Sequence, residues 1–235
     1  DIKINFNKKE IVNFLRKNRV NYSDIIPSSY LIISSYSEKF FTSGLSSDNI
    51  FYNEDKLSSL ELENNLMNFI IPDLSPNDRF IIPYNNIINN DVISLLKISN
   101  KYKAENTFII NIYNLDNKNF NAKINLYSSS SGKVLFIDEL NLINDIYFLD
   151  NIFLYLNNWL KNKYSINNNE INQLICQIQS INYEDLMNIK SKILNLSQLK
   201  SIKLITISYN NNIEKIEYYG DYNIFAKSLK LDKIN

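Results

Sequence analysis

The chain has 235 residues, and its 25 Lys and Arg balance its 25 Asp and Glu, so no basic excess favours nucleic-acid binding. It has no histidine, one cysteine (Cys176) and three glycines. These counts argue against histidine-based catalysis, an internal disulfide, a thiolate zinc site and a glycine-rich phosphate loop.

The N-terminal part of the chain predicts a strand, a helix and a buried strand. Residues 2–6 alternate apolar and polar side chains, and Lys8–Lys17 clusters its apolar residues at helical spacing. The apolar run Tyr30–Ile33 is typical of a buried strand. Residues 37–56 are polar and irregular, so they predict a loop.

The middle of the chain predicts two helices and a strand hairpin. Leu57–Phe69 carries an imperfect apolar stripe, and Pro72 and Pro76 then impose an extended or turning path. Asp91 is a candidate N-cap for the second helix, which carries Leu95 on its apolar face. Strands are predicted at Phe108–Tyr113, Ala122–Tyr127 and Val134–Ile137, the last two joined by a turn at Ser128–Gly132.

The clearest helix begins at Asp145 and keeps one apolar face as far as Leu160. Trp159 lies on this face, and we interpret it as a core residue rather than a platform for a ligand. Residues 161–169 are polar and have no apolar period, so they predict the domain boundary. Residues 21–163 would then form the middle domain.

Residues 170–235 predict a small β-α-β-β-α domain, with helices packed on one face of a sheet. Its elements are expected at Leu174–Ile181, Tyr183–Leu194, Ile202–Tyr209 and Ile213–Tyr219, with an asparagine turn at 210–212 and a last helix after Gly220 and Asp221. Residues 1–20 echo the strand and helix that end this domain. We interpret them as the remnant of an upstream β-α-β-β-α unit, and an ordinary strand–helix pair is the alternative.

Few residues are candidates for catalysis. Asp73 and Asp78 share a proline-bounded segment and could approach each other, and a solvated turn is the competing interpretation. The serine run Ser128–Ser131 has no histidine to activate it and fits a hairpin tip. Cys176 lies within a predicted strand, where a thiol behaves as a small apolar group. We therefore assign no catalytic, cofactor-binding or metal-binding residue and expect no cofactor.

No run of about eighteen apolar residues occurs, so no transmembrane helix is expected. The sequence begins at Asp1 without a basic and apolar leader, and we expect that any signal peptide has been removed. The abundance of Asn, Ile, Lys and Tyr indicates a sequence from an AT-rich genome.

Five segments in order carry a family resemblance: Ile4–Leu15, Pro27–Ile33, Ile71–Leu74, Lys101–Ile109 and Ile181–Leu229. Together they resemble a proteobacterial family of exported proteins, domain of unknown function 2066. The family's Trp and Gly positions in the middle region are Asn, Ile and Tyr in this chain. The resemblance implies a middle domain similar to the N-terminal domain of TolB, an α/β module of bacterial envelope proteins, and a periplasmic location. It brings no catalytic residues.

We therefore expect an α/β protein in which a TolB N-terminal-like domain with a mixed sheet precedes a small β-α-β-β-α domain. The expected function is that of a non-enzymatic envelope protein, a scaffold or protein-interaction module with envelope proteins as partners and no nucleic acid. The alternative is a small-ligand-binding or hydrolytic α/β protein that uses Asp73 and Asp78. A phage or eukaryotic-parasite structural protein also fits the Asn-rich composition.

Overall fold

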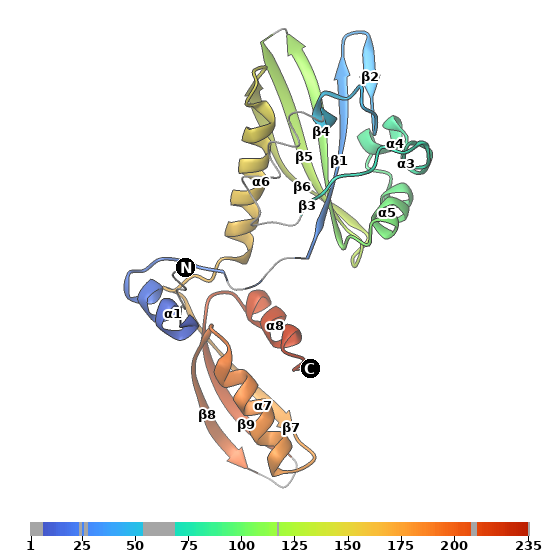
Figure 1. The fold of residues 1–235 in the computed structure, drawn as a ribbon. Coiled ribbons are helices and arrows are strands. Elements are labelled where there is room, and N and C mark those ends of the chain that lie inside the picture. Colours follow the sequence, from blue (N-terminus) through green and yellow to red (C-terminus); the bar gives the residue numbers. More distant parts are fainter. Residues whose placement is uncertain are drawn as a thin grey trace, which may run out of the picture. The chain divides into compact units, whose positions relative to one another are not determined.

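The structure is a computed structural model that describes residues 7–23, 25, 28–53, 69–116, 118–207 and 211–234 (Figure 1). The chain divides into two compact units. The larger unit is Pro27–Trp159, and the smaller unit combines Asp1–Ile26 with Leu160–Asn235. The fold is α/β, with a mixed sheet in the larger unit and a second, smaller sheet.

The larger unit holds most of the strands. In chain order its elements are β1 (Tyr30–Glu38), β2 (Phe41–Ser43), the 3-10 helix η1 (Ile50–Tyr52), β3 (Phe69–Ile70), α3 (Pro76–Ile81), α4 (Tyr84–Ile88), α5 (Val92–Lys101), β4 (Asn106–Asp116), β5 (Asn119–Ser128), β6 (Lys133–Ile143) and α6 (Phe148–Tyr164), which belongs to this unit as far as Trp159. Among the described residues its sheet has six strands, in the order β2-β1-β4-β5-β6, with β3 beside β1. The β1–β4 and β1–β3 pairs are parallel and the other pairs are antiparallel, so the sheet is mixed.

Alternation along β4 explains how both faces of this sheet are covered. Phe108 lies on the face toward α6 and makes an edge contact with Trp159, with ring centroids 5.7 Å apart. Its neighbour Thr107 points to the other face, where its hydroxyl hydrogen-bonds to that of Ser99 on α5 at 2.8 Å. Successive side chains of a strand point to opposite faces, so α6 and α5 cover opposite sides of β4. Trp159 is thus a packing residue, as predicted.

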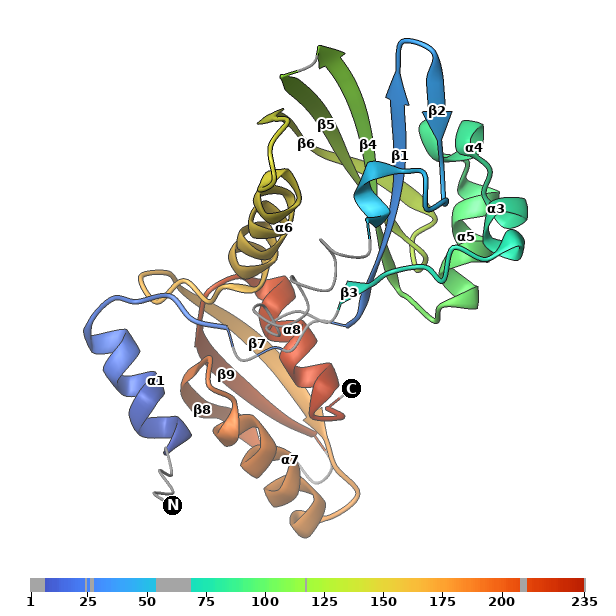
Figure 2. The ribbon, with the colours of Figure 1, turned by 45° about the horizontal axis from the view of Figure 1, so that its top comes forward.

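The smaller unit contains α1 (Lys8–Lys17), β7 (Ile171–Gln179), α7 (Tyr183–Asn195), β8 (Leu199–Ile207), β9 (Asn211–Tyr219) and α8 (Tyr222–Leu231). Its described strands run in the order β7-β9-β8, and both pairs are antiparallel. Figure 2 shows α7 and α8 on the same side of this sheet. Residues 170–235 therefore form the predicted β-α-β-β-α arrangement.

Local signals place the helices of the smaller unit. Asn182 caps α7 by accepting a hydrogen bond from the Asp185 backbone, and Asp221 caps α8 by accepting one from Asn223. Phe225 on α8 is fully buried and stacks on Tyr218 of β9, with centroids 4.2 Å apart. This pair joins the helical layer to the central strand.

One prediction about the region before α5 needs correction, and a second is tested only at Phe69. Residues 37–56 were expected to be a loop, but β1 runs to Glu38, β2 forms a hairpin with it, and η1 follows. The helix expected at Leu57–Phe69 lies largely outside the described residues, and Phe69 itself belongs to β3. Phe69 contacts the Phe108 and Phe153 rings, so tertiary packing outweighs the local helical pattern there.

The proline-bounded segment is not only a turn, because it begins α3. Pro76 occupies the first helical position, where its missing N–H costs nothing. Ser75 and Asp78 form a reciprocal capping box, in which each side chain accepts from the other residue's backbone N–H. A helix of six residues leaves too short an apolar pattern to be recognised from periodicity.

The predicted boundary segment, residues 161–169, begins within α6. Residues 161–164 are the last turn of α6, and the division by contacts falls at Trp159 and Leu160. Tyr164 is buried, and the Lys227 ammonium lies 4.6 Å from its ring centroid. Lys161 and Lys163 make the turn look polar, but they sit beside the one buried aromatic residue that anchors it.

Residues 7–23 pack with the C-terminal residues of the smaller unit. Tyr22 and Ile166 form a β-bridge, and the Asn168 side-chain amide donates to the Val20 carbonyl at 2.6 Å. The predicted strand at residues 2–6 lies outside the described residues. That residues 1–20 derive from an upstream repeat stays a prediction.

A buried ion pair crosses from the small sheet to its helices. Glu214 on β9 is 1% exposed, and its carboxylate lies 2.5 Å from the Lys190 ammonium on α7. We predict that Lys190→Met costs about 3–5 kcal/mol in free energy of unfolding, because it leaves a buried carboxylate without its partner. The double variant Lys190→Met, Glu214→Met should recover most of that loss in urea unfolding. Simple addition of the two single losses would contradict the prediction.

Candidate functional site

The Asp73 and Asp78 pair does not form an open carboxylate site. Asp78 is 0% exposed, and its carboxylate accepts hydrogen bonds from the Lys101 ammonium at 2.5 Å and the Tyr102 hydroxyl at 2.8 Å, besides those of Ser75. Asp73 is exposed, and its backbone N–H donates to the same Tyr102 hydroxyl at 2.8 Å. Asp78 therefore joins α3 to the end of α5.

Asp78 is held in its charged form. Burial alone would raise the pKa of its carboxyl, but hydrogen bonds from Lys101, Tyr102 and Ser75 outweigh burial and lower the pKa below its ordinary value. A carboxylate tuned this way is a poor proton donor near neutral pH. The geometry supports a structural role.

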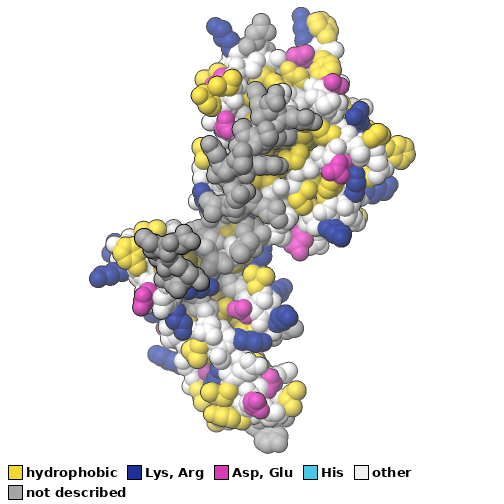
Figure 3. Space-filling model, in the orientation of Figure 1, with side chains coloured by type: hydrophobic (Ala, Val, Ile, Leu, Met, Phe, Trp, Pro, Cys, Tyr) yellow, Lys and Arg dark blue, Asp and Glu magenta, His cyan; other side chains and the backbone are white. Residues whose placement is uncertain are grey.

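The other sequence candidates also lie outside any catalytic arrangement. The serine run forms the tip of the β5–β6 hairpin, where the Ser128 and Ser130 hydroxyls hydrogen-bond to each other at 3.0 Å. Within the part of the chain that the structure describes, no group of three or more His, Cys, Asp or Glu residues could hold a metal ion. In the same residues, no helix has the length and apolarity needed to cross a membrane. On the face in Figure 3, side chains of both charges are interspersed.

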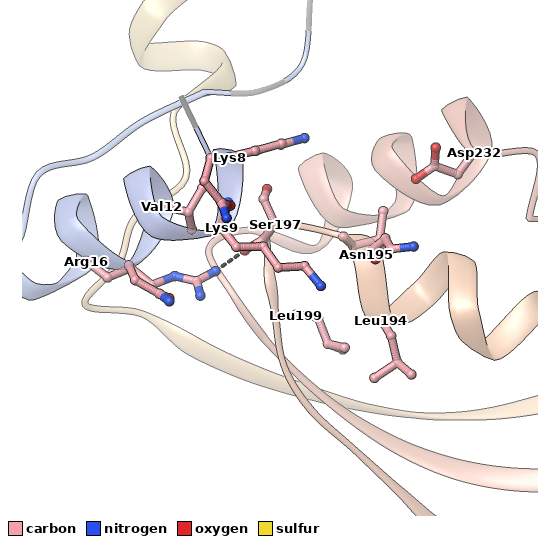
Figure 4. A pocket seen from close by; sticks show the side chains of 12 residues that line it. Lys8, Lys9, Val12, Arg16, Leu194, Asn195, Ser197, Leu199 and Asp232 are labelled. Carbon is pink, nitrogen blue, oxygen red and sulfur yellow. Dashed lines mark hydrogen bonds between the residues drawn. The ribbon is translucent and has the colours of Figure 1, made fainter. Parts of the chain in front are cut away.

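A polar pocket of about 630 Å³ lies in the smaller unit, where α1 meets the α7–β8 connection (Figure 4). Its charged side chains are Lys8, Lys9, Arg16 and Asp232, with asparagines and four apolar residues around them. Arg16 anchors α1 here: its guanidinium donates to the Ser197 carbonyl and lies 4.3 Å from the Tyr219 ring centroid. Ser197 follows the C-terminal end of α7, which carries partial negative charge. The positively charged Arg16 therefore holds α1 against this end of α7.

An apolar groove of about 400 Å³ lies in the same unit, among β7, β9, α7 and the end of α8. Its lining residues are Leu174, Cys176, Gln177, Ile178, Gln179, Ile189, Ile193, Ile216, Leu229, Lys233 and Ile234. Cys176 is half-buried rather than fully buried, and its thiol pKa is raised by burial and by the nearby Glu214. The thiol is therefore a packing group that also faces the groove.

Strand β7 beside this groove has an open outer edge. Among the described residues it pairs only with β9, continuously from Ile171 to Gln179 and without a register shift. Its sequence, INQLICQIQ, contains no charge, proline or glycine. Edge strands usually carry charges, prolines or bulges that prevent pairing with other chains. The β7 edge has none of these.

The described edges of β8 and β6 are protected. In β8 the register with β9 shifts twice, and Lys200 and Lys203 place charges along the strand. In β6 the register shifts between Phe136 and Asp138, and the Asp138 carboxylate accepts a hydrogen bond from Tyr155 on α6 at 2.7 Å. An inward-pointing charge of this kind discourages pairing. We therefore take the β7 edge and its groove as the candidate functional site.

Comparisons with known proteins give distant likenesses. No protein-family model matches the chain, and no curated protein sequence matches it. The solved structure of lipoprotein GNA1162 from Neisseria meningitidis has 11% identity and a TM-score of 0.37, over 58% of this chain and 98% of that one. The LpoB C-terminal domain from Salmonella enterica has 10% identity and a TM-score of 0.31, over 57% and 93%.

The Asp78 network gives a direct test by substitution. We predict that Asp78→Asn lowers the free energy of unfolding by about 2 kcal/mol at pH 7, because buried charge-assisted hydrogen bonds are lost. The control Asp73→Asn, at an exposed carboxylate, should change it by less than about 0.5 kcal/mol. Equal losses of unfolding free energy in the two variants would contradict the structural role of Asp78.

The lowered pKa of Asp78 also predicts that the effect of Asp78→Asn depends on pH. The folded-state pKa of Asp78 lies below its unfolded value of about 3.9, so its contribution is present above that pH and is lost as pH falls through the folded pKa. The stability difference between wild type and Asp78→Asn should therefore shrink as pH is lowered from about 5 to about 2. A difference independent of pH would show that the charge of Asp78 does not stabilise the fold.

Proposed function

We propose that this chain is a non-enzymatic protein-interaction module of the bacterial cell envelope that works in the periplasm. The observation that carries the proposal is the unprotected β7 edge, because an open strand offers hydrogen bonds to another protein and little to a small substrate. The periplasmic location rests on the sequence segments that resemble an exported family.

The alternative role as a hydrolase or small-ligand protein receives less support. Both carboxylate oxygens of Asp78 accept hydrogen bonds within the protein, and the exposed Asp73 offers no second positioned carboxylate beside it. The thiol of Cys176 faces an apolar groove that raises its pKa, which weakens it as a nucleophile. These groups serve folding and packing.

A photo-crosslinking residue placed on the sheet tests this function in the native host. Ile175 on β7 is 70% exposed, and Ile207 on β8 is 69% exposed, so the two positions are matched in chemistry and accessibility. We expect the full chain in the periplasmic fraction, with a discrete crosslink to an envelope protein from position 175 and little from 207.

Two results would contradict the proposal. The first is a chain that stays in the cytoplasm, and the second is the absence of crosslinks from 175, 207 and the exposed β6 position Phe136 alike. A crosslink from 136 alone would retain the interaction function and move its surface to the larger unit.

A further inference from the structure

We propose that the smaller unit binds its partner by strand addition: an extended, acidic peptide segment pairs with the outer edge of β7 and inserts alternate apolar side chains into the groove. This inference rests on the proposed function and names the chemistry of the partner. Main-chain hydrogen bonds would give affinity, and the groove would select side chains.

The lining of the groove shows that it includes the strand edge. Cys176, Gln177, Ile178 and Gln179 are consecutive, although alternate side chains of a strand point to opposite faces. Such a lining indicates that the space wraps around the last four residues of β7, where the outer edge is unpaired among the described residues. Ile216 of the central strand β9 also lines it and no residue of β8 does, so the groove lies over the β7–β9 half of the sheet.

The dimensions of the two layers explain why a gap exists on this side. Two helices of about 10 Å diameter lying side by side cover about 20 Å. Three strands spaced about 4.8 Å apart span only about 14 Å. By these dimensions two helices cover about one strand more than three strands provide. The groove lies under this layer, where Ile189 and Ile193 of α7 and Leu229 of α8 line it together with β7 and Ile216 of β9.

The groove lining selects what an added strand would carry. Ile189 and Ile193 of α7 and Leu229 of α8 form an apolar wall, which suits aliphatic side chains at every second position. Lys233 is the only charged residue among those that line the groove, and β7 carries no charge. An acidic residue in the incoming segment is thus favoured over a basic one.

A second copy of the chain fits this edge less well. Antiparallel β7–β7 pairing about a two-fold axis would place both helical layers on the same side of the joined sheet. By the same dimensions each layer is about one strand wider than its own sheet, so the two layers would compete for the space above the joined edge. The occupant we infer is therefore a single extended segment.

The only cysteine of the chain supplies a site-specific readout. The probe is an acetylated, amidated peptide of alternating Val and Thr in which two Thr are replaced by Glu. At a peptide concentration about ten times its Kd, we expect alkylation of Cys176 in the full chain to slow about tenfold. The same peptide with Lys in place of Glu should protect less, and Lys233→Glu should reverse that order.

Edge variants separate strand addition from simple filling of the groove. Ile175→Lys places a charge on the β7 edge at an exposed position and should abolish protection, whereas Ile207→Lys on the β8 edge should leave it unchanged. Circular dichroism and thermal unfolding of both variants confirm that they fold.

Three outcomes would overturn the inference. The first is that neither peptide slows the alkylation of Cys176. The second is that palmitate, a fatty-acid probe of the apolar groove, slows it and the peptides do not. The third is that the wild type forms a dimer that Ile175→Lys dissociates. Crosslinks from a photo-crosslinking residue at the exposed β7 position Gln177 that persist when Ile175 is replaced by Lys would overturn strand addition at β7 and leave the proposed envelope function standing. Loss of all crosslinks in the wild type would instead refute that function.

Discussion

A β-strand hydrogen-bonds on two sides, and among the described residues β7 uses only the side toward β9. The rest of the smaller unit follows from this constraint. β9 is saturated on both sides and carries the buried core through Ile216 and Tyr218. Strand β8 has register shifts and lysines that discourage pairing at its open edge. Strand β7 has neither, and all its side chains are uncharged.

Two buried carboxylates are each paired with a lysine. The Lys190–Glu214 pair joins α7 to β9 in the smaller unit, and the Lys101–Asp78 pair joins α5 to α3 in the larger unit. A buried charge is tolerated when a partner and hydrogen bonds compensate for lost hydration. Asp78 has both, through Lys101, Tyr102 and Ser75, whereas Glu214 is compensated by the ammonium of Lys190. Asp78, a carboxylate that the sequence offered as a candidate for catalysis, thus fixes the arrangement of α3 and α5.

Much of the fold could be predicted from local pattern. Long periodic elements such as α6 and α7, and caps such as Asp91 and Asp221, carry their signal within a few residues. The six-residue α3 and the three-residue β2 are too short to show a period, and β3 owes its place to Phe108 packing. The uncharged sequence of β7 could be read directly, but only its pairing with β9 shows that it is an edge strand. The groove could not be predicted, because its lining comes from four elements that are distant in sequence.

The most direct test of the central claim is residue-resolved amide hydrogen exchange across β7 in the free, full chain. If the outer edge is open, amides that point to β9 will exchange slowly and those between them will exchange rapidly, which gives an alternating pattern from Ile171 to Gln179. Uniformly slow exchange along the strand would show that another segment already pairs with this edge, and would contradict the account.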